Sequence, residues 1–248
     1  MTGSIVQRTI HTRGYELDMD GLVPPRTFLC YMEHLRWESL GEGDAQLAAL
    51  ISGGHQLVVV AQQLHLERDV GLGVALDGTL DLGHVGNTSM ELVHGFHAPG
   101  LGRVARGTVT VVLLAGGRPT PVPDSVRQSA AGRARQALAP SLEGEAPAGA
   151  WSMPLTVRAG ELDLLRHVNH ANHLGYFEDA RVAAARQGAH GDGARAGRLR
   201  RLALDYRHEA LLGDALEVLS WRLDDGALGF ELRRSDGRLL SRARVEAG

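Results

Sequence analysis

The chain has 248 residues and a net charge of −3, which is enough for two domains of about a hundred residues each and leaves no basic field for nucleic acid. Its single cysteine, Cys30, cannot form a disulfide within the chain and fits a reducing compartment. No stretch resembles a secretory signal or reaches the roughly 20 apolar residues of a membrane helix, so we expect a cytoplasmic protein.

In the first half, an extended segment leads to the tripeptide Glu-Leu-Asp at 16–18, and a helix is predicted over about 26–50. Four strand-like runs follow, at 56–68, 74–84, 88–97 and 103–114. The segment 116–150 is rich in Pro, Gly, Ala and Ser, which is typical of a linker, and it contains a short helical candidate at 124–137.

The second half repeats this order. A new strand begins at Trp151, a helix is predicted over 170–187, and four strands are predicted at 198–208, 214–223, 227–234 and 238–246. The Asp-Gly pairs at 225–226 and 236–237 predict hairpin turns between the last strands.

An internal repeat supports this symmetry. Residues 15–36 (YELDMDGLVPPRTFLCYMEHLR) and 160–181 (GELDLLRHVNHANHLGYFEDAR) agree at eight of 22 positions when one is shifted by 145. A weaker match relates HLERDVGLGVAL (65–76) to DYRHEALLGDAL (205–216). Such self-similarity is typical of a duplicated unit. The identical residues in the first match are Glu16/Glu161, Leu17/Leu162, Asp18/Asp163, Val23/Val168, Leu29/Leu174, Tyr31/Tyr176, Glu33/Glu178 and Arg36/Arg181.

One strand, one helix and four antiparallel strands form an α+β pattern, in which a long helix covers one face of a curved sheet. Two such units can pair their sheets edge to edge and so protect the edges. We therefore predict tandem domains at 1–115 and 151–248, joined by a linker with a short helix at 116–150, with the two sheets paired into one continuous sheet.

The motif Asp-x-x-x-His-Val-Asn at 163–169, followed by Tyr-Phe-Glu-Asp-Ala-Arg at 176–181, resembles the hot-dog thioesterases. The likeness is greatest to double hot-dog acyl-ACP thioesterases and to the 4-hydroxybenzoyl-CoA thioesterase type, and it covers both halves outside 116–150. It implies two tandem hot-dog domains and an acyl thioesterase of fatty acid metabolism that hydrolyses an acyl-ACP or acyl-CoA thioester. We also expect no metal, since no His-Glu-x-x-His motif and no cysteine-containing ligand set occurs, and no cofactor, nucleic acid or membrane partner. A monomer or a homodimer is expected, because two such domains in one chain mimic the usual dimer.

Asp163 lies just ahead of the predicted second helix. Thioester hydrolysis needs a nucleophile or a base that activates water, and donors for the oxygen that becomes negative. The backbone N–H groups at a helix N-terminus can be such donors. In the resembled family the aligned Asp is the nucleophile or the base, and we expect this role for Asp163. The alternative is a solvated or capping Asp at the end of a strand.

His167 and His170 are further candidates, and spacing alone does not decide between them. His167 could orient water, donate to the carbonyl or hold the carboxylate, and it matches the His of the plant-type acyl-ACP thioesterase motif. That motif also has an Asn where this chain has Leu165. His170 stands at the spacing seen in small bacterial hot-dog acyl-CoA thioesterases. An exposed loop imidazole is the alternative for His167.

Asn169 is also a candidate for the catalytic set, and the simpler interpretation is that it caps the helix, since Asn is a favoured N-cap residue. Capping would still fix the backbone donors that the chemistry needs. Glu178 lies one turn after Leu174, beside an apolar stripe, where it could act as a base or pair with Arg181. His173 is predicted to lie on the helix surface.

The first copy lacks most of this set. Where the second copy has His167, Asn169 and His170, the first has Leu22, Pro24 and Pro25, although Asp18 and Glu33 remain. Proline has no N–H to offer a carbonyl but can start a helix. We therefore expect one functional centre per chain, with the first domain helping to shape an acyl channel.

Two other functions fit the same residues: a hot-dog dehydratase or hydratase on acyl thioesters, and a non-catalytic module that binds them. A cluster of arginines before the second domain's strands fits phosphate groups of CoA or phosphopantetheine, or a solvated loop. Its members are Arg195, Arg198, Arg200 and Arg201.

Overall fold

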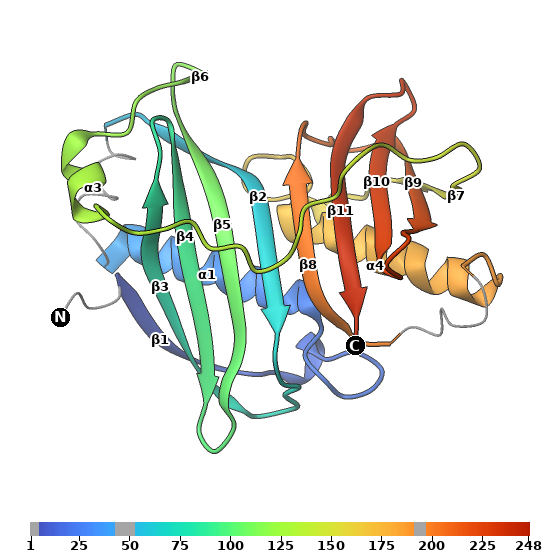
Figure 1. The fold of residues 1–248 in the computed structure, drawn as a ribbon, viewed down its shortest axis with the longest axis horizontal. Coiled ribbons are helices and arrows are strands. Elements are labelled where there is room, and N and C mark those ends of the chain that lie inside the picture. The colour runs from blue at the N-terminus through green and yellow to red at the C-terminus, as the bar shows by residue number, and fades with distance from the viewer. Residues whose placement is uncertain (1–4, 43–52, 191–196) are drawn as a thin grey trace. The chain divides into compact units, whose positions relative to one another are not determined.

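The computed structural model describes residues 5–42, 53–190 and 197–248. The chain divides into two compact units, Met1–Leu138 and Ala139–Gly248. Each unit has one long helix lying across one face of an antiparallel sheet (Figure 1). The expected linker, 116–150, is thus shared between the two units.

The first unit begins with β1 (Val6–His11) and a 3₁₀ turn (Gly14–Glu16), which lead into α1 (Pro25–Glu42). Four long strands follow: β2 (Gln56–Leu66), β3 (Ala75–Val85), β4 (Ser89–Ala98) and β5 (Gly102–Ala115), with a short β6 (Arg118–Pro119). The strands pair antiparallel in the order β1-β3-β4-β5-β2. The four predicted strands are confirmed, and so is the start of the helix at a proline. The predicted helical residues 43–50 lie outside the described residues.

The second unit has the same order of elements. β7 (Trp151–Thr156) and a 3₁₀ turn (Ala159–Glu161) lead into α4 (His170–Arg186), and then come β8 (Leu199–Tyr206), β9 (Ala215–Arg222), β10 (Leu228–Arg234) and β11 (Leu239–Ala247). Its sheet order, β7-β9-β10-β11-β8, repeats that of the first unit strand for strand. The duplication predicted from the sequence is therefore a duplication of topology.

The hairpin turns form at the predicted Asp-Gly pairs. Gly226 and Gly237 adopt φ angles of +85° and +84°, a conformation that glycine reaches without a steric penalty. Asp225 accepts a hydrogen bond from the backbone N–H of Ala227, and Asp236 accepts one from that of Arg238. These side-chain contacts fix where β9 ends and β10 begins, and where β10 ends and β11 begins.

The segment between the copies is ordered by buried acids on the outer sheet faces. Glu91 of β4 accepts the backbone N–H of Gln136 at 3.1 Å, and Glu231 of β10 accepts that of Ala146 at 3.2 Å. The predicted helix at 124–137 is wrong beyond α3 (Asp124–Ser129). The residues after it form a turn, in which Gly132 takes a φ of +80° that a helix does not allow.

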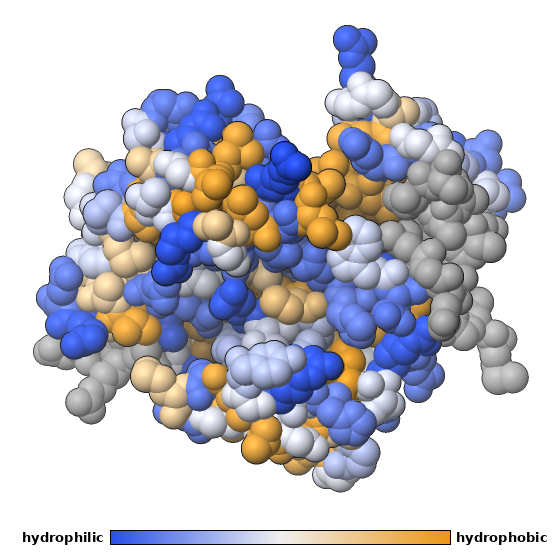
Figure 2. Space-filling view, turned by 180° about the vertical axis from the view of Figure 1, so that it is seen from behind, coloured by the Kyte–Doolittle hydropathy of each residue, from blue (hydrophilic) through white to orange (hydrophobic). Residues whose placement is uncertain are grey.

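The surface mixes hydrophilic and hydrophobic side chains when it is seen from behind the view of Figure 1 (Figure 2). Among the described residues, no helix is both long and apolar enough to cross a membrane.

The core is formed where the helices meet the sheets. Its fully buried side chains include Phe28 and Leu35 of α1, Phe177 of α4, and Phe96 and Phe230 of the strands.

One histidine is buried in the first core. His94 of β4 is only 1% exposed, and in the described structure neither ring nitrogen has a hydrogen-bond partner. Burial, aided by the charge of Arg36, lowers the pKa of His94 to about 3. In the second unit the equivalent strand position is Phe230, which packs on Phe177 with ring centroids 5.3 Å apart.

We predict that His94 makes the protein acid-sensitive. Its pKa is lower in the folded than in the unfolded chain, so the folded state binds fewer protons and stability falls as pH drops from about 6.5 towards 3. At about 1.4 kcal/mol per pKa unit, the loss amounts to several kcal/mol. Urea unfolding over this pH range should show a smaller loss for His94→Phe than for the wild type. Parallel losses in the two proteins would contradict the prediction.

Candidate functional site

The loop before α4 is closed by Asp163. The backbone N–H of Asp163 donates to the carbonyl of His167 at 2.9 Å, and the N–H of Arg166 donates to the carbonyl of Asp163 at 3.0 Å. The carboxylate Oδ1 of Asp163 also accepts the N–H of Leu165 at 2.8 Å. Such a side-chain contact two residues along the chain is a common way to stabilise a turn.

The first copy builds the same loop. Oδ1 of Asp18 accepts the backbone N–H of Asp20 at 3.0 Å and that of Leu22 at 3.1 Å. Gly21 has a φ of +74°, and its counterpart Arg166 has a φ of +65° although it carries a side chain. One role of the repeated Asp is therefore structural: it stabilises the loop in both copies, whether or not that copy has a catalytic function.

The second oxygen distinguishes the two copies. Oδ2 of Asp163 lies 3.2 Å from Nδ1 of His167, and the two side chains are 18% and 29% exposed. In the first copy the residue at the place of His167 is Leu22, so no such pair can form. A carboxylate beside Nδ1 favours the tautomer that carries its proton there, which leaves Nε2 as an acceptor. The short loop of residues 163–167 thus brings the side chains of Asp163 and His167 together.

The start of α4 confirms the predicted cap. Oδ1 of Asn169 accepts the N–H of Ala171 at 2.9 Å, and the carbonyl of Asn169 accepts the N–H of Asn172 at 2.8 Å. The N–H groups of Ala171 and Asn172 therefore already have acceptors, so these two amides are not available to polarise a substrate carbonyl. The helix dipole still places positive potential at this end.

A clamp that the sequence analysis missed holds the loop to the helix. The carboxylate of Glu161 accepts the hydroxyl of Tyr176 at 2.7 Å and the N–H of Arg158 at 2.7 Å. Although burial acts to raise the pKa of Glu161, these hydrogen bonds lower it below the usual range. The carbonyl of Glu161 also accepts the N–H of Asn169 and the side-chain amide of Asn172.

The first copy has the same clamp. The carboxylate of Glu16 accepts the hydroxyl of Tyr31 at 2.7 Å and the N–H of Arg13 at 2.8 Å, and its carbonyl accepts the hydroxyl of Thr27. The identities Glu16/Glu161 and Tyr31/Tyr176 in the repeat are therefore the sequence signal for this clamp, although the repeat alone does not indicate that the Glu and the Tyr contact each other.

His170 is the first residue of α4, and its surroundings differ from those of His167. The hydroxyl of Tyr206 donates to the backbone carbonyl of His170 at 3.0 Å. The two rings lie edge to face, with centroids 6.3 Å apart. His167 thus lies just before the helix, beside a carboxylate, whereas His170 lies at its first position, against an aromatic ring.

His173 is not on the helix surface, and that prediction was wrong. Its side chain is buried, and Nδ1 lies 2.7 Å from the hydroxyl oxygen of Ser241 on β11. Burial, aided by the charge of His167, lowers the pKa of His173 to about 4. The spacing of His173 to the buried residues Phe177, Ala180 and Ala184 is that of one helical face, which the polar residue type obscured.

Glu178 is half-buried on α4. Burial lowers the pKa of Arg181, and the charge of Glu178 acts against that effect, so the two side chains interact electrostatically. One guanidinium nitrogen of Arg181 donates to the carbonyl of Gly197 at 3.1 Å. A role for Glu178 as a base stays a prediction.

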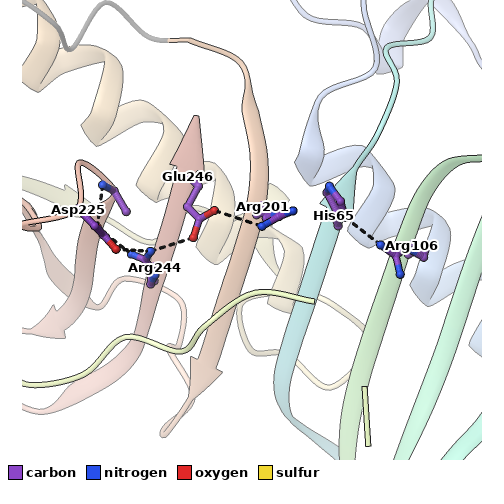
Figure 3. A network of polar contacts seen from close by, with 7 residues as sticks. His65, Arg106, Arg201, Asp225, Arg244 and Glu246 are labelled. Atoms are coloured by element: carbon purple, nitrogen blue, oxygen red, sulfur yellow. Dashed lines mark hydrogen bonds and ion pairs between the residues drawn. The ribbon is translucent and has the colours of Figure 1, made fainter. Parts of the chain in front are cut away.

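The arginine cluster is in part engaged by acids. Arg201 lies 4.0 Å from Glu246, which also pairs with Arg244, and Arg244 in turn binds Asp225 (Figure 3). In the first unit, Arg106 contacts His65 (Figure 3). Arg195 lies outside the described residues.

Within the described ranges, no group of three or more His, Cys, Asp or Glu side chains could hold a metal ion.

The rim of the loop is apolar. Leu164 and Leu165 are 88% and 72% exposed, and Leu212 is 60% exposed. Leu211, which is 43% exposed, forms an isolated β-bridge with His167. An exposed apolar group next to a polar pair suits a ligand that has both characters.

Comparison with known proteins agrees with the resemblance. Residues 157–247 match the model of the thioesterase-like superfamily. The 12:0-ACP thioesterase from Umbellularia californica is 19% identical, with a TM-score of 0.79 over 99% of this chain and 98% of that one. An acyl-ACP thioesterase from Bacteroides thetaiotaomicron is 12% identical, with a TM-score of 0.82 over 97% and 96%. No curated protein matches the chain. The chain has the double hot-dog fold, and the similarity to double hot-dog thioesterases is confirmed.

We predict that the two clamps contribute equally to stability. Tyr176→Phe and Tyr31→Phe each remove one hydroxyl that donates to a carboxylate, and each should cost about 2 kcal/mol, as hydrogen bonds to charged groups usually do. Denaturant unfolding of the two variants measures this. A loss in only one of them would show that the clamp is not shared by the copies.

Proposed function

We propose that this chain hydrolyses acyl thioesters carried by an acyl carrier protein or by CoA, and that the second unit holds the active site. The observation that carries the proposal is the contact of Asp163 with His167, on the loop that leads into α4. It lies inside the segment that matches the thioesterase-like superfamily, and the first copy has no counterpart.

His167 is the general base in this proposal. Its Nε2 takes a proton from a water molecule as the water oxygen bonds to the thioester carbonyl carbon, and Asp163 stabilises the imidazolium that forms. The carbon–sulfur bond then breaks, and the leaving thiolate takes the proton back from His167. The products are a free acid and a free thiol, and no proton is left over.

Asp163 as the attacking nucleophile is the alternative. In this structure, one oxygen of Asp163 is held by the N–H of Leu165 and the other faces His167, which supports a holding role over direct attack. One turnover in water labelled with ¹⁸O tests this choice. Label in the Asp163 carboxyl group would indicate a covalent acyl–Asp163 intermediate.

The surroundings of the pair suit a thioester. The dipole of α4 favours negative charge at its first turn, where the carbonyl oxygen would develop it. The exposed leucines at 164, 165, 211 and 212 offer apolar contacts to an acyl chain. Because the acyl-ACP thioesterases from Umbellularia californica and Bacteroides thetaiotaomicron align with nearly the whole chain, acyl-ACP is the first carrier to test.

We predict that Asp163→Asn and His167→Gln each lower kcat roughly a hundredfold or more, within the range of acid–base catalysis. Asn keeps an oxygen for the N–H of Leu165, so the loop should stay closed. The matched control is Asp18→Asn, which makes the same change in the first copy and should leave kcat unchanged. Thiol release from acyl-ACP and acyl-CoA of graded chain length, followed with a thiol reagent, measures all three.

Other outcomes would favour the other functions. Hydration of an enoyl thioester, followed by loss of absorbance, would favour a dehydratase or hydratase. Binding without thiol release from any acyl thioester would favour a non-catalytic module. Equal loss of kcat in Asp18→Asn and Asp163→Asn would contradict a single centre in the second unit.

A further inference from the structure

The second unit buries a polar side chain beneath the start of α4 that the proposed chemistry does not use. His173 is 3% exposed, with Nδ1 at 2.7 Å from the hydroxyl oxygen of Ser241. Its ring meets that of Tyr206 edge to face, with centroids 5.3 Å apart. Burying an imidazole costs free energy that a phenylalanine at the same place would not cost. A polar group that persists in a core is therefore a candidate for a functional role.

The first copy has an apolar residue at every equivalent place. The repeat relates His173 to Phe28 and Tyr206 to Leu66. Strand pairing extends this, because Ser241 lies opposite Tyr206 and Ala105 lies opposite Leu66. The histidine, tyrosine and serine thus occur together only in the copy that has the Asp163–His167 pair, as with His167 itself, whose counterpart is Leu22.

These buried residues connect to the start of the helix. The hydroxyl of Tyr206 donates to the carbonyl of His170 at 3.0 Å, and the ring of Tyr206 meets the rings of both His170 and His173 edge to face. Burial is the main cause of the low pKa of His173, about 4, and the charge of His167 adds to it. His173 therefore stays neutral near pH 7 and adds no charge that would oppose an imidazolium at His167.

We propose that His173, held by Ser241 and Tyr206, is a positioning residue that fixes His170 and the first turn of α4 relative to the Asp163–His167 pair. The inference rests on the proposed function, since the geometry that is fixed is that of the proposed site. His173 touches no substrate in this account and acts through Tyr206 and the helix backbone. The first copy, which needs no such geometry, fills the same space with Phe28 and its aromatic neighbours.

The direct test replaces His173 by the residue of the first copy. His173→Phe is expected to fold and to lower kcat about ten- to a hundredfold with KM little changed, because a small displacement of reacting groups costs that much. His173→Asn places a polar atom near the position of Nδ1 and should restore part of kcat through Ser241.

A matched control separates positioning from general stability. His190, beyond the far end of α4, has Nε2 3.0 Å from the hydroxyl oxygen of Ser220 and is also buried. The 17 residues of α4 span about 25 Å, so this second pair is remote from the site. His190→Phe should lower stability without lowering kcat. A kcat for His173→Phe that equals that of His190→Phe would overturn the proposal.

Two further measurements cover the remaining outcomes. Should His173→Phe not fold, Tyr206→Phe removes only the hydroxyl that binds His170 and is expected to lower kcat with KM little changed. Hydrogen exchange of the Ala171 and Asn172 amides should be faster in Tyr206→Phe than in His190→Phe, and equal rates would overturn the proposal. A wild type that releases no thiol would overturn the proposed function alone, because the exchange rates still decide the positioning claim.

Discussion

The carboxylate of Asp163 has two oxygens with different partners, and the geometry of the proposed site depends on this division. One oxygen closes the loop by accepting the N–H of Leu165, as Asp18 does in the first copy with the N–H groups of its own loop. The other faces Nδ1 of His167. Because the loop contact fixes the carboxylate, the imidazole meets an acceptor that is already in place, and little conformational entropy is lost when the pair forms. A structural residue can therefore take on a chemical role without losing the first one.

A comparison of the two copies distinguishes the features that stabilise the fold from those that belong to the proposed active site. Both keep the carboxylate–tyrosine clamp, the closed loop and the order of strands, which are the features that make the unit fold. Only the second replaces apolar residues beside the helix start by His167, His173, Tyr206 and Ser241. It also accepts a side chain at φ +65°, where the first copy has Gly21. Backbone strain and a buried imidazole both cost stability, so their occurrence together at the helix start of the second copy is what a functional site at that place predicts.

Much of this was predictable from the sequence, for physical reasons that differ between elements. The Asp-Gly pairs located the hairpin turns between the last strands, and Asn169 was recognised as a cap because its side chain suits the backbone geometry there. Pairing between side chains was not predictable. Tyr176 and Glu161 lie 15 residues apart, and only the folded loop brings them to 2.7 Å. His173 was misplaced because its residue type suggested solvent, whereas its spacing to Phe177 placed it in the core.

The state of the His167 ring tests the central claim most directly. A ¹⁵N NMR spectrum of the imidazole near neutral pH reports which ring nitrogen carries the proton. If Asp163 holds His167, the proton sits on Nδ1, Nε2 is free to accept one, and Asp163→Asn disturbs this preference. A ring with its proton on Nε2, or a tautomer mixture that Asp163→Asn leaves unchanged, would contradict the pairing and with it the proposed mechanism.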